Sequence, residues 1–288
     1  MIDLHTHSSA SDGEYSPSQL VFLAVEKGIS VLAITDHDTV QGLEEASAAA
    51  EGKKITFIKG IEININRPRG EFHLLGLGLQ KIAPELEQLT RRLQAERIGR
   101  NRTIIESMKA DGFSVDYAEL EAMFSGQSIG RPHIAAYLVE KRIVRRRQQA
   151  FDKYIGHGRP YYRSKEGAEL PEAISAILAS GGIPVIAHPL SLYISWGKMK
   201  DTLTELHNAG IQGLEAWHPG AKFSSCRRLE EMARQIGFFI TAGSDFHGEG
   251  VRADRKLGHT AGKTVIDDKY WTEELQPALQ ARGAFQDR

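Results

Sequence analysis

Cysteine is almost absent from this chain of 288 residues, which contains Cys226 alone. A single cysteine excludes an internal disulfide and the clustered thiolates of structural zinc sites. Any bound metal must therefore rely on histidine and carboxylate ligands. The same scarcity favours a reducing compartment, so we expect a cytoplasmic protein.

Long apolar runs are also missing. No stretch approaches the roughly 20 residues that a membrane-spanning helix needs, and the N-terminus lacks the basic, apolar and small-residue regions of a secretion signal. We therefore expect neither membrane insertion nor export. A chain of 288 residues buries a full core without disulfides or metal staples.

Net charge is close to zero, at -1, but the charges are unevenly distributed. Residues 86–165 contain 16 Lys and Arg against 9 Asp and Glu, so the rest of the chain is acidic. A positive segment above an acidic metal site would suit a phosphate-bearing substrate. Solvated helix faces, such as the run at 145–147, are the alternative explanation of the same charges.

Apolar, β-branched segments of strand length recur along the chain and alternate with helical patterns. The alternation predicts an α/β fold with parallel strands and right-handed crossovers. The seven predicted strands are Ile2–Leu4, Val31–Thr35, Ile55–Lys59, Phe72–Leu77, Ile183–Ala187, Ile211–Ala216 and Phe238–Ala242, and the helices between them are Ser18–Lys27, Leu170–Ser180, Lys198–Ala209 and Ser225–Gly237.

The alternation stops between about residues 80 and 165, where only helical patterns occur. A helical insertion between the fourth and fifth strands is the simplest account. Its predicted helices are Pro84–Asp111, Tyr117–Phe124, Arg131–Glu140 and Val144–Tyr154.

The first strand ends in a His-x-His pair, His5 and His7. Side chains at i and i+2 of a strand point the same way, so both imidazoles can reach one metal ion. Two histidines on a strand face are also common as polar surface. A metal-binding role of the pair is favoured by the other strands, because each has a residue of a metal-ligand type at one end. These residues are Asp12, His37, Glu62, His73, His188, Glu215, His218, Asp245 and His247.

These residues lie in motifs that resemble those of the polymerase and histidinol phosphatase (PHP) family of metal-dependent phosphoesterases. Arg-Pro-His at 131–133 resembles the branch of nucleoside 3′,5′-bisphosphate phosphatases and 5′ to 3′ oligoribonucleases. The motifs are His5-Thr-His7, Ser11-Asp12-Gly13, Thr35-Asp36-His37-Asp38, Gly60-Ile61-Glu62, Phe72-His73, Arg131-Pro132-His133, Ala187-His188-Pro189 and Ser244-Asp245-Phe246-His247.

The resemblance implies a distorted (β/α)7 TIM-like barrel made of residues 1–80 and 166–288, with residues 81–165 as a helical insertion domain that covers the active site. It also implies two or three divalent ions. Manganese, iron and zinc all suit mixed nitrogen and oxygen ligands. The implied ligands are His5, His7, Glu62 and Asp245 for one ion, Glu62, His73 and His188 for a second, and Asp12, His37 and His247 for a third.

The implied reaction is hydrolysis of a phosphomonoester by a metal-activated water. Asp245 and Glu62 would serve catalysis as ligands, and His218 is a candidate acid for the leaving oxygen, with a structural role as its alternative. Arginine matches phosphate oxygens in a bidentate way. We therefore expect substrate contacts from Arg131, His133, Arg100, Arg102 and Arg159.

The expected substrate is a nucleoside 3′,5′-bisphosphate, with 5′ to 3′ exonuclease action on short RNA as a further activity. Histidinol phosphate or another small phosphomonoester is an alternative within the family. An amidohydrolase-type barrel and a non-catalytic metal or nucleic-acid-binding module are alternatives outside it.

Three features bear on these alternatives. The intact ligand set argues against an inactive module, and the acidic residues within the insertion argue against a stable nucleic-acid complex. Members of the family often carry a further polar or histidine residue just beyond the sixth strand. Here His218-Pro219 is followed by Gly220-Ala221-Lys222.

Overall fold

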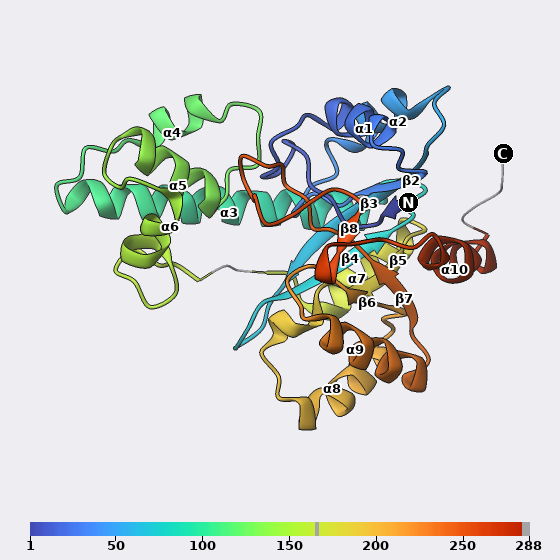
Figure 1. Ribbon diagram of the computed structural model, residues 1–288. Coiled ribbons are helices and arrows are strands. Elements are labelled where there is room, and N and C mark those ends of the chain that lie inside the picture. Colours follow the sequence, from blue (N-terminus) through green and yellow to red (C-terminus); the bar gives the residue numbers. More distant parts are fainter. Residues whose placement is uncertain (165–166, 284–288) are drawn as a thin grey trace.

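The computed structural model describes residues 1–164 and 167–283 of the chain. Its centre is a seven-stranded sheet in which each strand pairs with its neighbours in chain order (Figure 1). The strands are β1 (Ile2–Asp3), β2 (Val31–Ile34), β3 (Thr56–Ile65), β4 (Phe72–Leu77), β5 (Ile183–Ile186), β6 (Gly213–Trp217) and β7 (Phe239–Ala242).

The two outer strands of this order meet, so the sheet curls into a nearly closed barrel. Leu4 N donates to Ala242 O at 3.3 Å, and His7 N donates to Phe246 O at 2.9 Å. The backbone hydrogen bonds thus join the chain just after β1 to the chain just after β7. The predicted distorted TIM-like barrel is confirmed.

One strand departs from the predicted parallel arrangement. β4 runs antiparallel to both β3 and β5, whereas the other paired strands are parallel. β3 and β4 are joined by residues 66–71 without a crossover helix, and so short a connection reverses the chain. As a result, the beginning of β4, with His73, lies at the same edge as the carboxyl ends of the parallel strands.

Helices cover the outside of the barrel. The helix α1 (Pro17–Glu26) begins with a capping box in which Ser16 accepts from Gln19 N, and Gly28 follows it with φ 73°. The other helices of this layer are α2 (Leu43–Ala50), α7 (Leu170–Ala179), α8 (Trp196–Asn208) and α9 (Phe223–Ile236). Sequence patterns predicted all of them except α2, whose short Ala and Glu run lacks an apolar period.

The C-terminal part contains further elements that were not predicted. They are the hairpin of β8 (His259–Thr260) and β9 (Thr264–Val265), the short 3₁₀ turn η3 (Ala261–Lys263) between them, the π-helix η4 (Tyr270–Leu275) and α10 (Gln276–Ala281). A second 3₁₀ turn, η2 (Pro189–Leu192), follows β5.

The segment between β4 and β5 is helical, as predicted, and extends to one side of the barrel (Figure 1). The long helix α3 (Pro84–Ala110) joins two apolar clusters. Its residues Leu86, Leu89 and Leu93 pack in the barrel core, while Ile104 and Met108 pack among the other helices of the segment. Those helices are α4 (Tyr117–Met123), α5 (Arg131–Glu140), α6 (Arg147–Ala150) and the π-helix η1 (Phe151–Ile155).

None of the helices in residues 1–164 and 167–283 combines the length and the apolar character that crossing a membrane requires.

Truncation of an apolar side chain on α3 should separate its buried from its exposed positions. Ile104 is fully buried, whereas Ile98, on the same helix, is 47% exposed. We expect Ile104→Ala to lower the free energy of unfolding by about 2–5 kcal/mol, because it leaves a cavity. Ile98→Ala should change it by less than about 0.5 kcal/mol. Urea denaturation followed by circular dichroism measures both, and equal effects would contradict the assigned packing.

Candidate metal centre

All nine predicted metal ligands meet at one edge of the barrel. Parallel strands end at this edge, and the reversal of β4 adds its first residues to it. Each side chain is buried or nearly so. They are His5 and His7 after β1, Asp12 in the next loop, His37 after β2, Glu62 in β3, His73 in β4, His188 after β5, and Asp245 and His247 after β7.

Glu62 occupies the centre of this group and is fully buried. Its Oε1 lies 2.9 Å from His73 Nδ1 and 3.0 Å from His188 Nε2. Its Oε2 lies 2.7 Å from His37 Nδ1 and 3.4 Å from His7 Nε2. One carboxylate therefore faces imidazoles on both sides, which is the arrangement of a ligand that bridges two ions.

Asp245 forms a second group with the N-terminal histidine pair. Its Oδ1 lies 3.4 Å from His7 Nε2 and 3.8 Å from His5 Nε2. The two Nε2 atoms of His5 and His7 are themselves 3.2 Å apart. The strand geometry that suggested a shared ion thus brings both nitrogens to one point.

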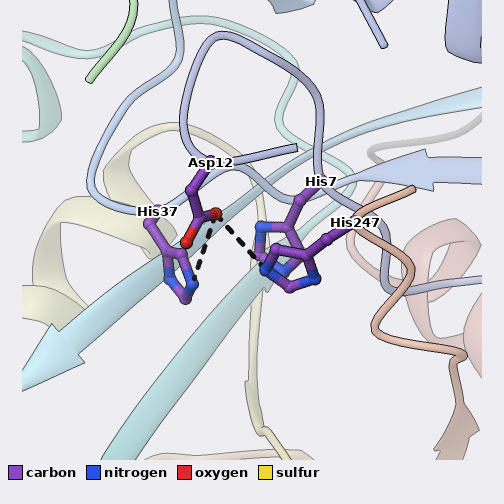
Figure 2. A group of neighbouring side chains, drawn as sticks. All are labelled: His7, Asp12, His37 and His247. Carbon is purple, nitrogen blue, oxygen red and sulfur yellow. Dashed lines mark ion pairs between the residues drawn. The ribbon is translucent and has the colours of Figure 1, made fainter. Parts of the chain in front are cut away.

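A third group surrounds Asp12 (Figure 2). Asp12 Oδ1 lies 3.3 Å from His247 Nε2 and 3.9 Å from His37 Nε2. The ring of His7 stacks on that of His247, with 4.1 Å between centroids. His7 therefore stands between this group and the one around Asp245.

The unsatisfied atoms in these groups fit divalent metal ions. Among the described residues, His7 Nδ1, His37 Nδ1 and Glu62 Oε2 are buried without a hydrogen-bond partner. His37 Nδ1 and Glu62 Oε2 lie close together without a hydrogen bond, as two ligands of one ion do. Buried polar groups left in this state are costly unless an ion binds them. Four sets of three or more ligand atoms lie within 4.8 Å of one another.

Burial and mutual contact shift the pKa values of these groups in opposite directions. Burial, followed by the charges of His247 and His37, lowers the pKa of His7 to about 3, so His7 stays neutral and able to bind a metal. Burial also acts to lower the pKa of His247, but the carboxylates of Asp12 and Asp245 raise it to about 9. An imidazole binds a metal in its neutral form, so this raised pKa means that protons compete with a metal ion for His247.

Carboxylates around the centre hold several of the ligands in place. Asp36 accepts hydrogen bonds from Ser8 N at 2.8 Å and from the hydroxyls of Ser8 and Ser11 at 2.6 Å each, which fixes the loop that carries Asp12. Glu215 contacts His5 Nδ1 at 3.0 Å through one oxygen and accepts from His188 N at 2.7 Å through the other.

Glu215 was named among the ligand-type residues of the strand ends, and Asp36 lies within the motif Thr35-Asp36-His37-Asp38. Neither was predicted to hold other residues of the site in place. Their partners, however, become visible only in three dimensions.

A cavity of about 1200 Å³ opens above the metal ligands. His218, Arg131 and Arg100 line it, together with four arginines that were not predicted, Arg97, Arg147, Arg252 and Arg255. His218 Nε2 lies 3.3 Å from Asp245 Oδ2, and its Nδ1 accepts from Gly220 N at 3.0 Å. Burial lowers the pKa of His218.

Three of the predicted substrate contacts do not line this cavity. His133 is buried at the start of α5, where Nδ1 accepts from Gly130 N at 2.9 Å. The Arg102 guanidinium lies 5.0 Å from the centre of the Tyr117 ring, because residues 100 and 102 point to opposite sides of α3. Arg159 is exposed at the surface.

The chain belongs to the PHP domain family, because the sequence model of this family matches residues 3–156. This places it among metal-dependent phosphoesterases, hydrolases that act on phosphoester bonds, as the motifs indicated.

Two curated relatives are similar over most of their length. The 3′,5′-nucleoside bisphosphate phosphatase of Chromobacterium violaceum is 32% identical over 94% of this chain and 95% of its own. The 5′-3′ exoribonuclease of Haemophilus influenzae is 35% identical over 85% of this chain and 89% of its own. These relatives confirm the branch that Arg-Pro-His indicated. A solved structure of a Chromobacterium violaceum amidohydrolase with bound sulfate and no metal has a TM-score of 0.83 and 31% identity, and covers 98% of this chain and 96% of that one.

Removal of the Asp36 carboxylate should weaken metal binding although Asp36 is not a ligand. We expect Asp36→Ala to lower the affinity for Mn²⁺ roughly 10- to 100-fold, because the loop of Asp12 loses three hydrogen bonds. Calorimetric titration with Mn²⁺ measures this change. Asp201→Ala, at an exposed position on α8, is the matched control. Unchanged affinity in Asp36→Ala would show that Asp36 does not position the ligands.

Proposed function

We propose that this protein hydrolyses the 3′-phosphate of nucleoside 3′,5′-bisphosphates. The observation that carries the proposal is a cluster of metal-ligand side chains at the base of a cavity whose walls carry arginines. Arginines beside a metal centre match a substrate with more than one phosphate group. The named activity of the Chromobacterium violaceum relative supports this choice of substrate.

In the proposed site, the nine side chains at the barrel edge hold two or three divalent ions. The group around Asp245 and the group around Asp12 would each hold one, and Glu62 would join a third position, near His73 and His188, to the first. Mixed nitrogen and oxygen ligands suit manganese, iron or zinc. Such ions make a water molecule acidic enough to attack at neutral pH and offset the charge of the phosphate.

The remaining groups would bind substrate and move protons. Arg131 and Arg100 lie on the helical side of the cavity and would contact the phosphate that is not hydrolysed. His218 lines the cavity, and its Nδ1 accepts from Gly220 N, so the ring proton is on Nε2, 3.3 Å from Asp245 Oδ2. When substrate is bound, this N–H would donate to the leaving oxygen instead of to Asp245. Residues 81–165 would form the insertion domain that covers this site.

Exonuclease action on short RNA is a second candidate function. The cavity of about 1200 Å³ is larger than a typical small-molecule site, which leaves space for more than one nucleotide. The name of the Haemophilus influenzae relative agrees with this candidate. Cys226 is the only cysteine of the chain, which favours a reducing, cytoplasmic setting for either substrate.

The substrate class can be tested with a panel of phosphate esters. Phosphate release should be fastest from nucleoside 3′,5′-bisphosphates among a set that also contains mononucleotides, sugar phosphates, histidinol phosphate and 5′-phosphorylated short RNA. Treatment with a chelator should abolish release, and added Mn²⁺ should restore it. Full activity in protein shown by elemental analysis to be metal-free would contradict the mechanism, and preference for another ester would contradict the substrate.

Arg131 should contribute to binding more than to the chemical step. We expect Arg131→Ala to raise KM for the bisphosphate about tenfold or more with little change in kcat, because its contact is made before and during the reaction alike. Steady-state kinetics measures both constants. Arg102→Ala removes an arginine that stacks on Tyr117 outside the cavity and should leave both unchanged.

A further inference from the structure

Two arginines without a role so far lie on the loop that follows β7. Arg252 Nη1 lies 3.5 Å from Asp245 Oδ2, and Arg255 Nε lies 3.6 Å from the same oxygen. Both side chains line the cavity above the metal centre. These distances are too long for hydrogen bonds, so the carboxylate attracts the two guanidinium groups without occupying their donors.

Arg255 has a donor that needs an acceptor. Its side chain is only 8% exposed, and its Nε is buried without a hydrogen-bond partner among the described residues. On the other side of the guanidinium, Nη1 donates to Asp254 at 2.8 Å. A buried N–H without an acceptor is costly. Because the side chain lines the cavity, a small shift would let this N–H donate to an anion bound there.

The backbone at Gly220 makes room for this arginine. A Cβ atom at position 220 would lie 3.2 Å from Arg255 Nη2 and 2.9 Å from the ring of His218. A side chain at position 220 would therefore crowd both His218 and Arg255. The guanidinium of Arg255 uses that space, beside His218 and Asp245.

The cavity therefore has two cationic walls with different surroundings. On the helical wall, Arg131 Nη2 lies 4.0 Å from Glu71, and its guanidinium lies 5.4 Å from the centre of the Tyr162 ring. On the loop after β7, Arg252 and Arg255 approach a carboxylate of the metal centre itself. These two guanidinium groups therefore lie beside a side chain that would hold an ion.

We propose that Arg252 and Arg255 grip the phosphoryl group that is hydrolysed, while the helical wall contacts the rest of the substrate. Hydrolysis joins a water oxygen to phosphorus, breaks the ester P–O bond and places a proton on the leaving oxygen. The two guanidinium groups contact only the non-bridging oxygens, whose negative charge they stabilise throughout. The proposal rests on the proposed function only in that the substrate is a phosphomonoester.

The test compares Arg255→Gln, Arg255→Lys and Arg252→Ala with Arg159→Ala, which removes an exposed arginine outside the cavity. Two probes are used on manganese-loaded protein, inorganic phosphate in calorimetric titrations and p-nitrophenyl phosphate in kinetic assays. Arg255→Gln and Arg252→Ala should weaken phosphate binding roughly tenfold or more, because each loses a charge-assisted contact. Arg255→Lys keeps the positive charge but loses the forked guanidinium, so its phosphate affinity should lie between those of the wild type and Arg255→Gln. Arg159→Ala should bind phosphate as tightly as the wild type does.

The substrate dependence gives a second, independent readout. Arg255→Gln and Arg252→Ala should each lower kcat/KM, and in each variant the factor should be the same for p-nitrophenyl phosphate as for the nucleoside bisphosphate. A loss confined to the bisphosphate would overturn the proposal, because the loop would then contact the other phosphate. A parallel loss of Mn²⁺ affinity in both variants would also overturn it, because the arginines would then only position Asp245.

Two further outcomes are separated by the design. If the wild type hydrolyses p-nitrophenyl phosphate but not the bisphosphate, the proposed function fails while the test of the arginines stands. If Arg255→Gln does not fold, Arg252→Ala decides, because its side chain is 38% exposed and tolerates truncation. Unchanged phosphate affinity in Arg252→Ala overturns the proposal by itself.

Discussion

The structure depends most on one buried carboxylate among imidazoles. Glu62 lies in the middle of β3 with no exposed surface, and its two oxygens face histidines from four other segments of the chain. An isolated carboxylate in such a place would be neutralised by protonation. Here the charges of His37 and His73 outweigh burial and keep its pKa well below the usual range. Divalent metal ions bound to the two oxygens of Glu62 would likewise offset the negative charge of this buried carboxylate.

This constraint explains why the barrel is distorted. A regular α/β barrel would direct the beginning of its fourth strand away from the catalytic edge. The hairpin between β3 and β4 reverses that strand, and His73 then pairs with Asn64 in the register and faces Glu62. The irregularity thus adds a ligand to the carboxyl edge that a parallel strand would not provide.

The local sequence predicted the elements and the ligands well, because both follow from short patterns. Strand-length apolar runs located all seven strands, and the motifs that resemble those of the PHP family contained all nine members of the cluster. The direction of β4 escaped prediction because strand propensity is the same for both directions. Contacts between distant segments escaped as well. The sequence did not show that Arg100 and Arg102 point to different sides of α3, so that Arg102 lies over Tyr117 and not in the cavity. It also did not show that Arg255 lies near Asp245.

The basic middle of the chain now has two explanations that hold together. Arg97, Arg100, Arg131 and the exposed Arg147 line the cavity, whereas Arg145 and Arg146 are exposed to solvent and do not line it. The net charge of residues 86–165 counts the arginines that line the cavity together with those that do not. Within this segment, the arginines placed to contact the proposed substrate are those of α3, α5 and α6 that line the cavity.

The closure of the barrel by its first and last strands has a consequence for how the protein is made. His5 and Asp245 meet only when backbone hydrogen bonds join the chain after β1 to the chain after β7. Contacts between residues so far apart in sequence form late, because a long loop must close first. Asp245 follows His5 by 240 residues, so this part of the metal centre cannot form during synthesis before β7 and the residues just after it have been made.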